Sequence, residues 1–202
     1  NQNLVVAGTG FVAGITPVFS GAGVTVNSVT VSSATSLTVN VSVDAAAATG
    51  ARSLTLTNVD KGTATLATGL TVNAGPTVTS LAPASRAAGA TSQSVVITGT
   101  GFVTGAVASF TGTGITVNST TFTSATSITA NVTVSAGATL GVSDVTVTNP
   151  DAGNRTLVGG FTVVAPATVT AASPTSVGVG AVTKTITVNG TNFLPTSTVA
   201  FS

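Results

Sequence analysis

A repeat of 91 residues constrains this 202-residue chain more than any other feature. Residues 1–91 align with residues 92–182 without a gap, 45 of the 91 positions are identical, and the last 20 residues begin a third copy. A period of 91 exceeds the roughly 20–50 residues of a solenoid unit and suits one small β-sandwich domain. The landmark residues that keep this offset are Gly8, Gly99 and Gly190; Phe11, Phe102 and Phe193; Phe19, Phe110 and Phe201; Asp60 and Asp151; and Pro83 and Pro174.

Within each copy the apolar residues recur at every second position. Residues 37–43 alternate Leu or Val with Thr, Asn or Ser, and residues 128–134 repeat the pattern. A period of two that is rich in Val and Thr is typical of half-buried antiparallel strands. Turn-forming residues at 58–62 and 149–153 separate the strands. We therefore expect an all-β chain of tandem immunoglobulin-like β-sandwich domains without the Cys and Trp core of antibody domains.

Several ordered motifs resemble those of IPT/TIG domains. They are the opening segment 76–83, Gly89, the segment 95–102 that ends in Gly-Thr-Gly-Phe, the later segment 145–151 and the closing strand 161–163. The resemblance implies an immunoglobulin-like sandwich that bacterial surface proteins use as a repeated stalk module. Relatives also occur in eukaryotic receptors and in transcription factors that contact DNA, but the Arg and Lys residues for phosphate contacts are missing here.

This resemblance also predicts where the domains begin and end. Residues 1–75 form a repeat without its first strand, residues 76–165 form a complete repeat, and residues 166–202 start a third, truncated repeat. We expect either that the chain is a window from a longer array, or that neighbouring chains complete the broken domains by strand donation.

Composition narrows the function classes. His, Cys and Glu do not occur in the sequence, so the commonest general bases, metal ligands and thiol nucleophiles are missing and we expect no enzyme, cofactor or metal site. Five basic and four acidic residues give a net charge of +1, which predicts no nucleic-acid partner. The sequence contains no apolar run of about 18 residues, so we expect no membrane insertion of this segment. The low charge and the Thr, Ser, Gly and Val content suggest an extracellular or cell-surface protein.

Each candidate site has a simpler structural interpretation. Gly8-Thr9-Gly10-Phe11 resembles a dinucleotide fingerprint, but no helix or acidic residue follows, so a turn between strands is favoured. Asp60 and Asp151 are the only charges kept between the full copies. They fit turn formation better than a weak calcium site. A Lys–Asn crosslink is disfavoured because no Lys position is shared by the copies.

Aromatic and Asn residues give two further expectations. Six of the eight Phe residues lie at repeat-equivalent positions, which predicts a core role and disfavours a sugar-binding platform. Glycans remain an open hypothesis at the five Asn-x-Ser/Thr sites, which are Asn40, Asn118, Asn131, Asn154 and Asn189.

The leading interpretation is a non-catalytic structural module of a long extracellular array, a stalk, fibre or filament subunit. Because few charges protect the strand edges, we expect its partners to be other copies of the same chain. The alternative is an adhesin or binding module that presents loops or a tip domain. Segment 104–114 shares only 4 of 11 positions with 13–23, a lower fraction than the whole repeat shows.

Overall fold

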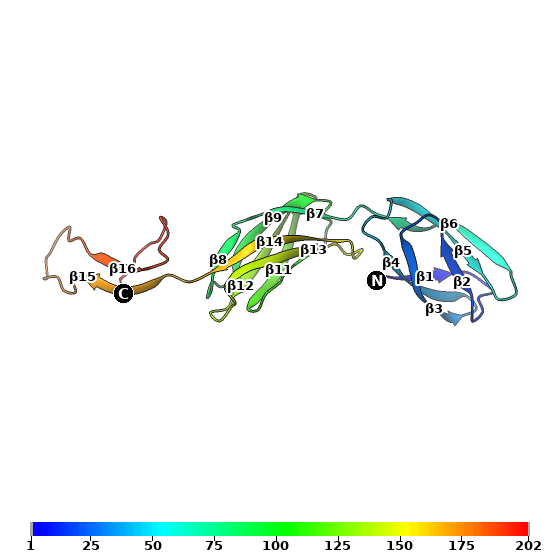
Figure 1. The fold of residues 1–202 in the computed structure, drawn as a ribbon, viewed down its shortest axis with the longest axis horizontal. Coiled ribbons are helices and arrows are strands. Elements are labelled where there is room, and N and C mark those ends of the chain that lie inside the picture. The colour runs from blue at the N-terminus through cyan, green and yellow to red at the C-terminus, as the bar shows by residue number, and fades with distance from the viewer. Residues whose placement is uncertain (1, 202) are drawn as a thin grey trace.

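The computed structural model describes residues 2–201, which form sixteen β-strands in five sheets and contain no helix. Two β-sandwiches and a small two-stranded sheet follow one another along the long axis of the molecule (Figure 1). All strand pairs are antiparallel except one. The all-β, sandwich-type fold expected from the alternating sequence pattern is therefore confirmed.

The second sandwich contains eight strands. One sheet has the order β11-β12-β9-β7 and the other the order β10-β13-β14-β8. With β7 and β8 counted together as the first strand, this is the immunoglobulin arrangement, with the first, second, fifth and fourth strands in one sheet. The strands are β7 (Thr77–Ala82), β8 (Ser85–Ala87), β9 (Gln93–Thr100), β10 (Val107–Phe110), β11 (Ile115–Ser124), β12 (Ser127–Val134), β13 (Gly141–Thr148) and β14 (Asn154–Val164).

The opening segment of this sandwich crosses from one sheet to the other. Strand β7 pairs antiparallel with β9, and the chain then passes the cis Ala82–Pro83 peptide bond. Strand β8 follows and pairs in parallel with β14. One continuous segment therefore closes an edge of both sheets.

The first sandwich has two three-stranded sheets, ordered β1-β4-β3 and β2-β5-β6. Each of its strands begins 91 residues before its counterpart in the second sandwich. Among residues 2–201 it has no counterpart of β7 or β8, so β1 pairs only with β4 and β6 only with β5. Its strands are β1 (Gln2–Ala7), β2 (Thr16–Phe19), β3 (Val24–Ser33), β4 (Ser36–Val43), β5 (Gly50–Thr57) and β6 (Thr63–Val72).

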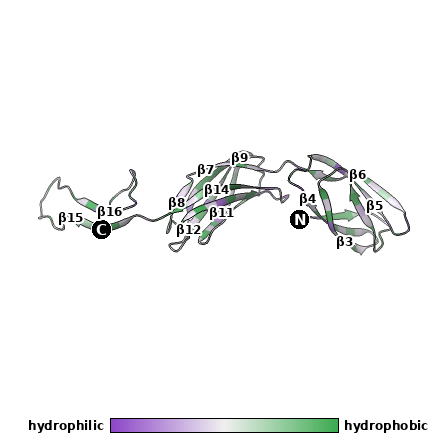
Figure 2. Cartoon of the chain, in the orientation of Figure 1, coloured by the Kyte–Doolittle hydropathy of each residue, from purple (hydrophilic) through white to green (hydrophobic). Residues whose placement is uncertain are grey.

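Apolar and polar residues alternate along the strands of both sandwiches, as Figure 2 shows by colour, and the alternating apolar residues supply the two cores. The second core draws residues from both sheets, including Val95 and Ile128 from one and Val145 and Phe161 from the other. The Phe110 and Phe161 rings meet edge to face with centroids 5.1 Å apart, a favourable aromatic geometry. Phe11 and Phe102 are also buried, as predicted.

The missing edge leaves the first core less covered. Val134 is 0% exposed, whereas Val43 at the equivalent position is 44% exposed. Leu4 and Leu70 are only half-buried, although Val95 and Phe161 at the matching positions are fully buried. An apolar margin of the first sandwich is therefore open to solvent.

The third segment forms one small sheet of β15 (Thr168–Ser173) and β16 (Thr187–Thr191). Phe193 and Phe201 are 43% and 75% exposed among the described residues, unlike Phe102 at the equivalent position of the second sandwich. No second sheet covers them within the described part of the chain, and a repeat-equivalent position gives burial only where the facing sheet is present.

Polar side chains on the strands bond to one another across the sheets. Thr hydroxyl pairs link neighbouring strands at 2.7–3.0 Å, and Asn27, Asn40 and Asn3 form an amide ladder over the first sheet. Such cross-strand pairs stabilise a sheet by a few tenths of a kcal/mol to about 1 kcal/mol each. The outer faces are thus polar without being charged.

Candidate functional site

The Gly-Thr-Gly-Phe loop is built around close contacts. A Cβ on Gly99 would collide with the carbonyl oxygen of Thr77 in β7 and lie 2.6 Å from the Phe102 ring. Gly190 has the same relation to Thr168 and Phe193, whereas a Cβ on Gly8 would meet only the Phe11 ring. The motif therefore makes room for a Phe ring and, where the first strand is present, for the backbone of that strand.

The second glycine of the motif supplies a left-handed backbone. Gly10 and Gly101 have φ values of 72° and 69°, and Asn192 replaces this glycine with φ of 59°. Asn is among the few residues other than Gly that adopt this conformation readily. The substitution in the third copy therefore keeps the turn.

A buried asparagine, which sequence reasoning did not single out, fixes this loop. Asn149 is 4% exposed, and its Nδ2 donates to the carbonyl oxygen of Gly101 at 2.8 Å while its Oδ1 accepts from Val103 N at 3.4 Å. Asn58 donates to the carbonyl oxygen of Gly10 at 2.8 Å in the first sandwich. Asn58 and Asn149 occupy equivalent positions of the two copies, and this identity is the sequence signal from which a shared role could have been predicted.

Asp60 and Asp151 lie in the turns between the last two strands of each sandwich. The Asp60 Oδ1 accepts from Gly62 N at 2.9 Å, and the Asp151 Oδ1 accepts from Gly153 N at 3.1 Å. Among residues 2–201, no three acidic side chains gather where they could hold a metal ion. Each carboxylate thus stabilises its own turn.

Asp151 also reaches the junction between the two sandwiches. Its Oδ2 accepts a hydrogen bond from Asn73 Nδ2 at 3.1 Å, so a turn of the second sandwich contacts the segment that leaves the first. Pro76 in the linker is buried. A Cβ on Gly153 would lie 3.7 Å from its ring and 3.6 Å from the Gly75 Cα. The linker is therefore packed against the second sandwich.

A cleft of about 800 Å³ opens beside this junction, along the uncovered margin of the first sandwich. Its walls come from the start of β1, the end of β4, the end of β6, the linker 73–76 and the turn 150–155. We name it the margin cleft. Leu4, Val41, Leu70 and Val72 give it an apolar side.

The second sandwich shows what occupies the equivalent space. There β8 pairs with residues 162–164 of β14. Gly89 N donates to the carbonyl oxygen of Val134, and Val134 N donates to the carbonyl oxygen of Ala90. The Arg86 guanidinium donates to the carbonyl oxygen of Ser94. The positions 91 residues earlier are Thr71, Val72, Asn73, Val43 and Asn3, and all five line the margin cleft. The cleft is therefore the space that segment 84–91 fills in the second sandwich.

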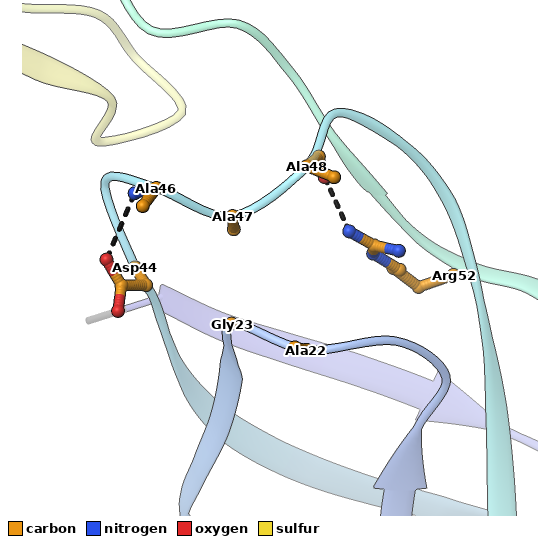
Figure 3. Close-up of a pocket in the computed structure, with 7 residues that line it drawn as sticks. All are labelled: Ala22, Gly23, Asp44, Ala46, Ala47, Ala48 and Arg52. Atoms are coloured by element: carbon orange, nitrogen blue, oxygen red, sulfur yellow. Dashed lines mark hydrogen bonds between the residues drawn. The ribbon is translucent and has the colours of Figure 1, made fainter.

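A second, shallower pocket of about 390 Å³ lies at the turn between β4 and β5 (Figure 3). Asp44 Oδ1 accepts from Ala46 N at 3.0 Å, and Arg52 donates to the Ala48 carbonyl oxygen at 2.5 Å. Both charged side chains are thus engaged with the turn itself. Ala22, Gly23 and Ala47 complete the pocket wall.

Three of the glycosylation candidates are engaged by neighbouring parts of the sheets, and one of them is Asn118, whose Nδ2 donates to Asn131 Oδ1 at 2.7 Å and to Thr133 Oγ1 at 2.9 Å. Asn40 Nδ2 donates to Asn3 Oδ1 at 2.6 Å, and Asn131 Nδ2 donates to the Ser92 carbonyl oxygen at 3.2 Å. A glycan replaces one of the two hydrogens on Nδ2, so it would break a bond shown at Asn118, which donates two, whereas Asn40 and Asn131 could keep the bond shown.

The described residues include no helix that could cross a membrane. No protein-family model matches the sequence, and no curated protein matches it either. Among solved structures, the chain is similar to Yersinia pseudotuberculosis InvD, with 18% sequence identity, a TM-score of 0.29 and coverage of 87% of this chain. The chain spans 54% of that structure. Similarity of this extent leaves function to be argued from the residues of this chain.

Proposed function

We propose that this chain is a non-catalytic structural segment of an extracellular stalk, fibre or filament, built from IPT/TIG-like repeats at 1–75, 76–165 and 166–202. The observation that carries the proposal is the linear series of sandwiches with a packed junction. Two sandwiches succeed each other along one axis, and Asn73, Asp151 and the buried Pro76 hold the segment between them. Such a series provides length, because each sandwich adds its own span to the fibre.

Self-association is the second part of the proposal. Strands β2, β3, β10 and β11 are edge strands, each paired on one side only among the described residues. Only nine of the 202 residues are charged, so little electrostatic repulsion opposes pairing with the strand edge of another copy. Open strand edges with so little charge favour contacts between copies of the chain.

Sedimentation velocity over a wide concentration range, with electron microscopy of the most concentrated sample, tests this function. We expect concentration-dependent oligomers and elongated particles. A chain that stays strictly monomeric and shows no ordered contacts would reduce the proposal to a simple spacer.

A binding module is the second candidate, because the residues that line the shallow pocket of Figure 3 differ between the two copies. Five of its seven lining positions change between the copies, and the pairs that change are Ala22 and Thr113, Asp44 and Ser135, Ala46 and Gly137, Ala48 and Thr139, and Arg52 and Ser143. Variable loops on a constant framework are typical of binding sites. A glycan or peptide array probed with the chain and with Arg52→Ser would support this function if a ligand bound only the original chain.

A further inference from the structure

We propose that the outer face of the sheets β1-β4-β3 and β11-β12-β9-β7 is the surface through which copies of this chain associate side by side. This contact rests on the proposed self-association and names the surface that carries it. In the first sandwich the face consists of the alternate residues 3–7 and 36–42, their partners in β3 and the bulged Asn27. In the second sandwich it consists of the positions 91 residues later. None of these side chains is buried, and we call them the uncharged face.

Charge is distributed unequally between the two sheets of each sandwich. Strands β1, β3, β4, β7, β9, β11 and β12 contain no charged residue. The charged residues that lie in strands all belong to β5, β8, β13 or β14 of the opposite sheets, and they are Arg52, Arg86, Asp144 and Arg155. Because the centres of protein interfaces are depleted of charged residues, this asymmetry favours contact through the uncharged face.

The uncharged face is also nearly the same in the two sandwiches. Nine of its twelve positions are identical, whereas only four of the eight ladder positions that point outward from β2, β5 and β6 are identical. Exposed positions tolerate most substitutions with little effect on stability, so the fold alone does not require this identity. Val5 and Val96 illustrate this, because they are 68% and 37% exposed and occupy equivalent positions. A face that recurs in successive repeats fits a partner that recurs with the same spacing, and another copy of the chain is such a partner.

The polar groups of the face can pair with those of a second copy. Asn40 Nδ2 donates to Asn3 Oδ1 at 2.6 Å, and Asn118 Nδ2 donates to Asn131 Oδ1 at 2.7 Å. These bonds hold the amides in place, and side chains that are already ordered lose less entropy when a partner binds. Amides and hydroxyls carry donors as well as acceptors, so the face can be complementary to itself across a two-fold axis.

The size of the face agrees with the association of arrays rather than of single sandwiches. Three strands about 4.8 Å apart, each of about eight residues at about 3.4 Å, cover roughly 400 Å² per sandwich. A standard interface buries about 800 Å² on each partner. One sandwich therefore offers too little area for a stable contact, and the two sandwiches of the chain together reach it.

Paired lysine substitutions test the face against a matched control. Thr38→Lys combined with Thr129→Lys places one positive charge on the uncharged face of each sandwich. Thr55→Lys combined with Thr146→Lys adds the same charge to the opposite outer faces. All four threonines are half-buried and lie on inner strands of their sheets, which are β4, β12, β5 and β13. Thermal unfolding verifies that both double variants fold.

Sedimentation velocity at low ionic strength compares the association of the unmodified chain and the two variants. We expect the association constant of the Thr38/Thr129 variant to fall at least about tenfold, because like charges would meet across the contact, and that of the control to stay within about twofold. Added salt should restore part of the loss, because it screens the repulsion. An equal effect in both variants would overturn the assignment of the face and keep the proposed self-association. A strictly monomeric unmodified chain would reject both.

Crosslinking provides a second measurement that adds no charge. The sequence has no Cys, so Thr129→Cys and Thr146→Cys chains each carry a single thiol. With a short bis-maleimide reagent we expect at least about fivefold more covalent dimer from Thr129→Cys, because thiols held at a contact react at a raised effective concentration. Equal yields from the two chains would contradict the proposed contact.

Discussion

Replacing Asn149 by alanine tests how the second sandwich holds its Gly-Thr-Gly-Phe loop. The side chain is buried and spans from the turn after β13 to the carbonyl oxygen of Gly101 and the amide of Val103. Alanine removes both bonds and leaves these backbone groups without their protein partner. The substitution therefore removes only the two hydrogen bonds that join Asn149 to the Gly-Thr-Gly-Phe loop.

The distances set the expected magnitude. A buried group left without a partner costs about 1–3 kcal/mol. The 2.8 Å bond to Gly101 is short and should contribute fully, whereas the 3.4 Å bond from Val103 N is long and should contribute little. We expect Asn149→Ala to lower the free energy of unfolding of the second sandwich by about 1–3 kcal/mol, nearly all of it from the bond to Gly101. Asn58→Ala should lower that of the first by about 1–2 kcal/mol, because Asn58 Oδ1 has no partner to lose.

Calorimetry combined with hydrogen exchange measures the effect and assigns it to a sandwich. Each kcal/mol should lower the Tm of a domain of this size by roughly 4–8 °C. Asn154→Ala is the control, because its exposed side chain bonds only to the nearby Ala152 carbonyl oxygen. If Asn149→Ala behaved like Asn154→Ala, or if protection fell equally in both sandwiches, the reasoning would be refuted.

Three further outcomes follow from the same structure. Gly99→Ala should destabilise its sandwich by more than about 3 kcal/mol, because the new methyl group collides with the β7 backbone. Gly8→Ala should destabilise the first sandwich less, and urea unfolding of the two variants measures the difference. Phe161→Ala should cost about 3–5 kcal/mol through loss of a fully buried ring, measured by the same unfolding, and a loss under 1 kcal/mol would contradict the core assignment. Asp151→Ala should broaden the distribution of angles between the sandwiches in small-angle X-ray scattering, while Asp60→Ala, which bonds only within its turn, should not.

The alternation of apolar and polar residues was sufficient to predict the sandwich. Leu37, Val39 and Val41 are buried in β4 because every second side chain of a strand faces the same side. Burial at the margins could not be predicted in this way. Val43 continues the pattern and is nevertheless exposed, because its cover in the other copy comes from residues 88–90, which are distant in sequence.

The candidate site shows the same division. The turns at Asp60 and Asp151 follow from local preference, so their positions could be predicted from neighbouring residues. Asn149 serves a loop 46 residues earlier in the chain, and the margin cleft is formed by three strands, a linker and a turn of the next sandwich. Such sites depend on tertiary contacts that residue spacing does not encode.

The crossing of β7 and β8 between the sheets bears on how the second sandwich carries tension. The chain enters this sandwich at Pro76 and leaves it after Val164, and β8 lies parallel to β14 close to that exit. Pulling the two ends apart would slide β8 along β14. Two hydrogen bonds would then be loaded together in shear rather than opened one at a time. Thr162 N donates one to the carbonyl oxygen of Ala84, and Ala88 N donates the other to the carbonyl oxygen of Val164. A stalk of such units would withstand stretching mainly through this short parallel pair.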